Sequence, residues 1–223
     1  MIPFIDIHSH HPPAEGVVAI QNILNPDAAA RLLEKEGLYS IGIHPRHIHP
    51  DHWLDDVTTL KEYIHHPKVL AIGEAGMDGL TDLPLSLQEE VFMAVVQLSE
   101  EAKKPLIIHS VRTHHEISII HRNLKPTQPW ILHGFNVRNT IAKGMINHGL
   151  YLSFGETLLK HHSPSAEVVS SMPLDLLFIE TDDKQIDVRE LYQRVATLRD
   201  LEMEILKNDI YQRFCKIFGY AGT

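Results

Sequence analysis

The sequence predicts an α/β protein, a single (β/α)₈ barrel of the TIM-barrel type. Short apolar runs of four to eight residues recur along all 223 residues, and helix signals fall between them. Runs that are apolar throughout are typical of parallel strands buried on both faces. Eight such strands in one series favour a closed barrel over an open sheet. The expected strands are Phe4–His8, Val17–Leu24, Leu38–His44, Val69–Glu74, Leu106–His109, Trp130–His133, Leu150–Phe154 and Leu176–Glu180.

Helix signals separate most of these strands. Asn25 is a suitable N-cap for a helix that opens at Pro26 and stops at Gly37. The segment 86–89 reads as a capping box for the next helix, and another helix is expected between 136–139 and Gly149. The last helix carries an apolar stripe, formed by Ile210, Tyr211, Phe214, Ile217 and Phe218.

No helix fits between the first two expected strands, so the strand Val17–Leu24 is the weakest part of the barrel prediction. We find no linker, repeat or low-complexity tract, so one domain over residues 1–223 is the economical interpretation.

Composition narrows the class of function. Hydrophobic residues make up 43% of the chain and charged residues 22%, as in a soluble globular protein. The net charge of −9 argues against broad, charge-driven binding to nucleic acid, although bound divalent cations can reverse the potential inside a pocket. The single cysteine, Cys215, allows neither an internal disulfide nor a cysteine-based zinc site. We expect a cytoplasmic protein with no membrane segment and no obligate protein partner.

The 17 histidines are the compositional anomaly, and their positions are informative. In the segment Asp6-Ile-His-Ser-His10, alternate side chains of a strand project to one face, so His8 and His10 can share one metal ion. Asp6 lies on the same side and can support them. Taken alone, the pair is a weak signal for a metal site, because chance and surface histidines also produce it.

Other strands also end in metal-binding residue types. Glu74 closes the fourth run, His109 the fifth and His133 the sixth, while Asp182 lies just past the eighth. The carboxyl ends of barrel strands converge on one face. Strand ends meet solvent, which explains one or two polar residues there but not this set of histidines and carboxylates. The pattern therefore predicts a metal site.

The chain resembles the TatD family of metal-dependent deoxyribonucleases, within the amidohydrolase-like barrels. The segments that carry the resemblance span nearly the whole chain, and their order and spacing together are specific. They are Asp6–His10, Gly42-Ile-His-Pro45, Gly73-Glu-Ala-Gly-Met-Asp78, Gln88–Phe92, Pro105–Ser110, Ile131-Leu-His-Gly-Phe135, Leu152–Gly155, Glu180-Thr-Asp182 and Asn208–Phe218.

The resemblance implies a role for each matching residue. One metal would be held by His8, His10 and Asp182, and a second by His109 with His133. Glu74 would bridge them, and its presence in place of a carboxylated lysine separates this pattern from the urease-like branch of the superfamily. We expect one or two divalent ions, and Mg²⁺, Mn²⁺ and Zn²⁺ all tolerate such mixed ligands.

The implied chemistry is hydrolysis of a phosphodiester by a metal-activated water. Glu74 and Asp182 would be the catalytic residues, with Asp182 both ligand and general base. His44 is expected at the rim, either contacting a phosphate oxygen or held by Pro45 in a structural turn.

The loops after Asp78 and Asp182 are short for this family, so substrate contacts would be reduced even with an intact metal centre. We expect DNA or a short oligonucleotide as substrate, acted on at ends or in single strands. The alternative is another small phosphoester, or an amide or aminoacyl-ester substrate. A metal-binding scaffold without turnover is disfavoured because all six site residues are present. Histidinol-phosphatase-like barrels also open with an Asp-x-His-x-His strand, but they generally need additional ligands that we cannot assign in this sequence.

Overall fold

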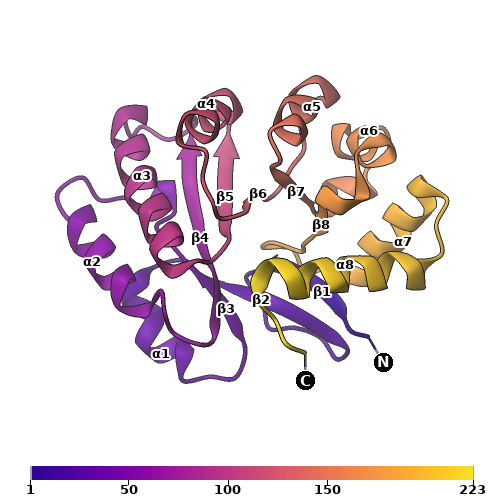
Figure 1. The fold of residues 1–223 in the computed structure, drawn as a ribbon, viewed down its shortest axis with the longest axis horizontal. Coiled ribbons are helices and arrows are strands. Elements are labelled where there is room, and N and C mark those ends of the chain that lie inside the picture. Colours follow the sequence, from indigo (N-terminus) through magenta and orange to yellow (C-terminus); the bar gives the residue numbers. More distant parts are fainter. Residues whose placement is uncertain (1, 223) are drawn as a thin grey trace. The chain divides into compact units, whose positions relative to one another are not determined.

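A computed structural model describes residues 2–222 of the chain. Eight strands form one sheet in the order of the sequence, and the pairs β1–β2, β3–β4, β4–β5 and β7–β8 are parallel. Strands alternate with helices from β2 onward (Figure 1). This is the topology of the predicted (β/α)₈ class, and every predicted strand is present. The strands are β1 (Phe4–Ser9), β2 (Val17–Ile23), β3 (Leu38–Ile41), β4 (Val69–Asp78), β5 (Leu106–Val111), β6 (Trp130–Leu132), β7 (Tyr151–Phe154) and β8 (Leu177–Ile179).

The helices include those expected at four positions, with shifted bounds. They are α1 (Ala29–Leu33), α2 (Trp53–Tyr63), α3 (Leu85–Ala102), α4 (His114–Leu124), α5 (Asn139–Asn147), α6 (Pro164–Ser171), α7 (Val188–Arg199) and α8 (Met203–Phe218). Short 3₁₀ turns are η1 (Pro26–Ala28), η2 (Pro45–His47), η3 (Glu156–Leu159) and η4 (Leu174–Leu176). No helix within 2–222 is long and apolar enough to cross a membrane.

The chain divides into two compact units. The first comprises Met1–Gln21 with Leu132–Thr223, and the second comprises Asn22–Ile131. One domain over the whole chain stays a prediction.

In the second unit, α3 packs against β4 through buried residues that include Val91, Phe92 and Val95. The capping box predicted at 86–89 is wrong, because the helix begins earlier, with Pro84 at the N-cap. Gln88 is instead fully buried, and its side-chain amide binds the backbone N–H and C=O of Asp78 at 2.7 and 3.2 Å. It thereby fixes the end of β4.

The strand β4 continues past Glu74 to Asp78, beyond its predicted end. Gly76 makes this possible. It has a φ of +150°, and a Cβ at that position would lie 2.0 Å from the carbonyl oxygen of His109 on β5. Close backbone approach therefore keeps β4 and β5 paired, and Glu74 and His109 lie inside these strands instead of at their ends.

In the first unit, α7 and α8 pack against β1. The Tyr192 hydroxyl on α7 donates to the Ile5 carbonyl and accepts from the Ile5 N–H, both at 3.1 Å. On α8, shown in yellow in Figure 1, Ile210, Phe214 and Phe218 are buried at four-residue spacing, as the apolar stripe predicted.

The first and last strands meet in this unit. Ser9 and Asp182 form a parallel bridge, in which the Asp182 N–H donates to the His8 carbonyl and the His10 N–H donates to the Asp182 carbonyl, each at 2.9 Å. Backbone pairing thus places Asp182 directly beside the two histidines of β1.

Candidate metal centre

The first unit holds a group of two imidazoles and one carboxylate. Asp182 Oδ1 lies 3.6 Å from His8 Nε2 and 3.3 Å from His10 Nε2. The three potential ligand atoms all lie within 4.8 Å of one another. Asp182 has a φ of 55°, a left-handed conformation that aspartate tolerates better than most residues.

Asp182 stays ionised in this setting. Burial works to raise its pKa, but hydrogen bonds from His10 and His8 and the nearby charge of His133 outweigh it. Together they hold the pKa of Asp182 well below its usual range. An ionised carboxylate beside two imidazoles is a ligand set that a divalent cation accepts.

Asp6 supports this group through the backbone. Its Oδ1 accepts the His8 N–H at 3.3 Å and the Thr181 N–H at 3.1 Å, and its Oδ2 accepts the Thr181 hydroxyl at 2.6 Å. The carboxyl is 3% exposed, and burial raises the pKa of Asp6 to about 7. Asp6 therefore ties together the two chain segments that present His8 and Asp182.

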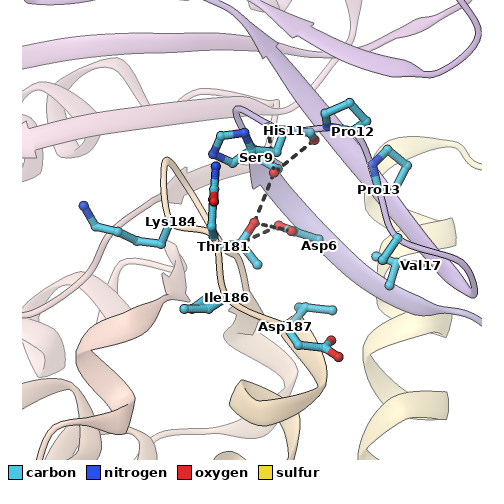
Figure 2. A pocket seen from close by; sticks show the side chains of 13 residues that line it. Asp6, Ser9, His11, Pro12, Pro13, Val17, Thr181, Lys184, Ile186 and Asp187 are labelled. Atoms are coloured by element: carbon cyan, nitrogen blue, oxygen red, sulfur yellow. Dashed lines mark hydrogen bonds between the residues drawn. The ribbon is translucent and has the colours of Figure 1, made fainter.

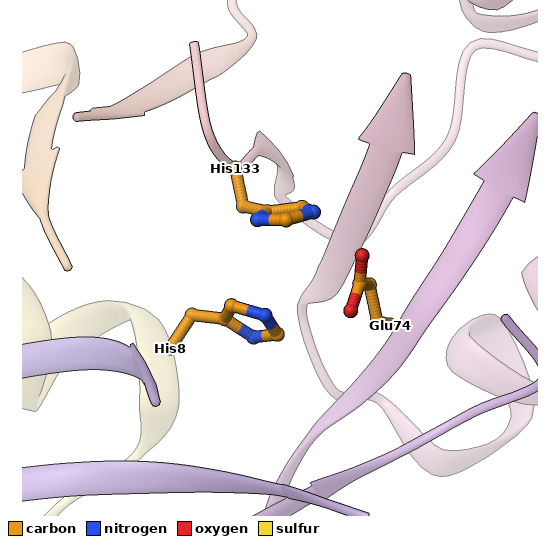
Figure 3. A group of neighbouring side chains, drawn as sticks. All are labelled: His8, Glu74 and His133. Carbon is orange, nitrogen blue, oxygen red and sulfur yellow. The ribbon is translucent and has the colours of Figure 1, made fainter. Parts of the chain in front are cut away.

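His133, which follows β6, lies against His8. The two ring centroids are 4.4 Å apart, and Figure 3 shows the side chains facing each other. His133 Nδ1 is 3.4 Å from Glu180 Oε1, which also accepts the Gly134 N–H at 2.5 Å. A carboxylate on one ring nitrogen orients the other nitrogen toward a metal. The sequence does not identify the role of Glu180, although it lies two residues before Asp182 in the segment Glu180-Thr-Asp182.

The second unit holds a second group. Glu74 Oε1 lies 2.8 Å from His109 Nδ1 and 3.2 Å from His44 Nε2, and these three potential ligand atoms are also within 4.8 Å of one another. Glu74 is 4% exposed and projects from β4, as drawn in Figure 3. The carboxylate is therefore buried among the donors of two imidazoles.

Two residues that the sequence did not single out as site residues support this second group. The Asn22 amide donates to Glu74 Oε2, and its oxygen accepts the Glu74 N–H, both at 3.1 Å. Asp78 Oδ2 lies 3.2 Å from His109 Nε2 and accepts from Arg46 Nε at 2.8 Å. The His109 ring is thus held between two carboxylates, and Glu74 is held on both its backbone and its side chain.

His44 does not lie at a solvent-exposed rim. It is 8% exposed and precedes η2, where its Nδ1 accepts the Arg46 N–H at 3.0 Å. An Nδ1 that accepts leaves the proton of a neutral imidazole on Nε2. Burial lowers the pKa of His44, which favours this neutral form. The Nε2–H then points at Glu74 and His109, so His44 is a hydrogen-bond donor directed into the group.

The structure thus brings together His8, His10 and Asp182 in one unit, and Glu74 and His109 in the other. His133 lies with His8 and Glu180. The shared second metal of His109 and His133, and the bridging role of Glu74, join residues of both units and stay predictions. The first group offers two imidazoles and a carboxylate in reach of one ion. The second offers the His109 imidazole and the Glu74 carboxylate, with His44 as a hydrogen-bond donor beside them. Imidazole and carboxylate ligands of this kind fit the divalent cation that the family implies.

Comparison with known proteins agrees with the fold. The family model described as TatD related DNase matches residues 17–219. An uncharacterized metal-dependent hydrolase of Buchnera aphidicola is 32% identical over 77% of this chain and 67% of its own length. A metal-dependent hydrolase of Methanocaldococcus jannaschii is 27% identical over 92% of this chain and 86% of its own. The TatD homologue YjjV of Escherichia coli superposes with a TM-score of 0.87 at 22% identity, covering 99% of this chain and all of that one.

The family match and these relatives, together with the sheet order and the strand-to-helix alternation, show a metal-dependent hydrolase with a (β/α)₈ fold. Within that class, the chain belongs to the TatD related DNase family, whose model covers most of its length.

Proposed function

We propose that this metal-dependent hydrolase cleaves phosphodiester bonds in DNA or short oligonucleotides, at ends or in single strands. The observation that carries the proposal is the pair of imidazole–carboxylate groups, one with Asp182 and one with Glu74. Divalent ions held there would supply an activated water and neutralise the charge that develops on the phosphoryl oxygens. His8, His10 and Asp182 would hold one ion, and Glu74, His109 and His133 are the proposed ligands of the second.

Asp182 is suited to hold the proton of the attacking water. Both imidazole contacts use its Oδ1, and the side chain is 34% exposed. Its Oδ2 is therefore available to accept a proton from a water at the group. His8 and His10 keep the carboxylate ionised and fixed in place.

His44 is suited to bind the substrate phosphate. Its Nε2–H is directed into the second group, and burial keeps the ring neutral. A neutral donor of this kind stabilises a non-bridging phosphate oxygen without releasing a proton. A fully charged residue would cost more to bury at this position.

The charge of the protein favours the ends of nucleic acids or single strands as substrates over the interior of a duplex. The net charge is −9, and the cations expected near the strand ends are few, namely Arg46, Arg112 and Arg138. Arg46 is already bound to Asp78 at 2.8 Å. A protein that tracks a duplex needs several cationic phosphate contacts and shows a steep salt dependence. This one would rely on its metals and on the phosphates nearest them.

Hydrolysis of a linear single strand, compared with the same sequence closed into a circle, tests the proposal across a salt series. We expect cleavage of the linear strand with a shallow salt dependence, and little cleavage of the circle. Rapid cleavage of circles, or a steep loss of activity with salt, would contradict the preference for ends. If the metal-loaded protein hydrolyses amides, aminoacyl esters or small phosphoesters but no oligonucleotide, the alternative substrate class replaces DNA.

A further inference from the structure

The first unit contains a cavity beside the Asp182 group that no step above uses. It has a volume of about 370 Å³ and lies between the loop after β1 and the loop after β8. Ligand pockets start at roughly 300 Å³, so this cavity suits a small molecule and not an extended chain. Figure 2 shows Pro12 and Pro13 on one side and Ile186 and Asp187 on another.

The floor of the cavity is a hydrogen-bonded chain. The His11 N–H donates to Ser9 Oγ at 3.2 Å, the hydroxyls of Ser9 and Thr181 are 3.1 Å apart, and the Thr181 hydroxyl donates to Asp6 at 2.6 Å. Ser9, Thr181 and Asp6 are all buried. Their positions are therefore fixed before any ligand arrives, which lowers the entropy lost on binding.

The walls are apolar and come from both loops. Pro12, Pro13 and Val17 contribute one side, and Ile186 and Val188 contribute the other. The imidazole of His11 lies 3.2 Å from the Asp183 carbonyl and so links the two loops. Apolar walls around a polar floor suit a planar ring with hydrogen-bonding edges, because the faces contact the walls while the edge meets the hydroxyls.

A second, smaller cavity lies between the first cavity and the proposed metal ligand Asp182. It has a volume of about 130 Å³ and is lined by Glu180, Thr181, Asp182 and Lys184 among others. Thr181 and Lys184 line both cavities, which are therefore neighbours. The Lys184 ammonium is paired with Asp183 at 2.8 Å. A phosphate at Asp182 would place the group attached to it near the larger cavity.

We infer that the cavity between the loops after β1 and β8 is a subsite for one nucleoside, holding the base of the terminal nucleotide. This rests on the proposed function and deepens it. A cavity of this size accepts one base but not a continuing chain, so it accounts for a requirement for ends that the metal ligands do not impose.

Filling the cavity tests the inference. The variants are Ile186→Trp and, on an exposed loop where folding is less at risk, Ala14→Trp. Ile205→Trp is the matched control because Ile205 is 57% exposed on α8. We titrate 2′-deoxyadenosine into the metal-loaded full-length protein and follow binding by calorimetry and NMR. We expect saturable binding that weakens at least about tenfold in either cavity variant and stays unchanged in the control.

Catalysis gives a second measurement. Two oligonucleotides that differ only in whether the terminal nucleotide carries a base are compared by kcat/KM. We expect a preference for the base-bearing end that falls to about 1 in Ile186→Trp, in line with the loss of a buried aromatic contact. If no oligonucleotide is cleaved, the proposed function fails, while saturable deoxyadenosine binding lost in both cavity variants still supports the subsite. No saturable binding, or binding that both cavity variants retain, overturns it.

Discussion

Replacing Asp182 with asparagine tests the chemistry of the first ligand group. The substitution keeps the size of the side chain and leaves an oxygen for the contacts that Oδ1 makes with His8 and His10, now 3.6 and 3.3 Å. It removes the negative charge and the site that accepts a proton. General-base catalysis contributes about 10²–10⁴-fold to rate, so we expect kcat to fall at least about 10²-fold while metal stays bound. That loss corresponds to about 2.7 kcal/mol of barrier.

The assay is steady-state hydrolysis of a linear single-stranded oligonucleotide, with bound metal measured on the same samples. Asp183→Asn is the matched control, because Asp183 is the next residue and its 60% exposed side chain pairs with Lys184. We expect this control to be active. If Asp182→Asn retains activity within a few-fold of the parent protein, Asp182 is not the base and the reasoning from its position fails.

Three further predictions concern the residues that support the site and the fold. Glu180→Gln should weaken metal binding by about 10–100-fold, measured by titration with a metal-sensitive dye, because it weakens the contact that orients His133; unchanged affinity would refute this role. The pKa of Asp6 is about 7 in the folded protein and near 3.8 in the unfolded chain. The contribution of Asp6 to the free energy of unfolding is therefore fully present below pH 3.8 and is lost as the pH rises through about 7. In urea unfolding of the metal-free proteins, the free energy of unfolding should fall between pH 5 and 8 by about 2–3 kcal/mol more in the parent protein than in Asp6→Asn. Parallel pH profiles of stability for the two proteins would count against this role of Asp6. Gln88→Ala should lower the free energy of unfolding by about 1–3 kcal/mol, because it leaves the buried N–H of Asp78 without its acceptor; a change below about 0.5 kcal/mol would show that water replaces the amide.

Strand positions were predictable because each buried strand is apolar on both faces. The placement of His8 and His10 on one face followed from the two-residue period of a strand, and the structure brings both to Asp182. Strand ends were less predictable. The extension of β4 depends on how closely Gly76 lets β5 approach, and that distance is a tertiary property.

The supporting residues were the part that sequence reasoning missed. Asn22 lies in a run otherwise rich in apolar residues, so a polar side chain there was an available signal, but its partner Glu74 is distant in sequence. Asp78 and Glu180 each lay in motifs that had been recognised, yet their roles depend on which histidine they contact. The pattern at 86–89 predicts a helix cap that includes Gln88, but the helix starts directly after Pro84, which places Gln88 inside the helix.

Metal content of the Glu74→Ala protein tests the central claim most directly. Glu74 is buried, contacts His109 and His44, and is the proposed bridge between two ions. Elemental analysis after equilibrium dialysis against Mn²⁺ or Zn²⁺ would be compared among the parent protein, Glu74→Ala and Glu90→Ala, which alters an exposed residue of α3. We predict that Glu74→Ala folds, by circular dichroism, but loses at least one bound metal and its hydrolytic activity, while Glu90→Ala keeps both. A folded Glu74→Ala protein with the metal content and turnover of its parent would contradict the account.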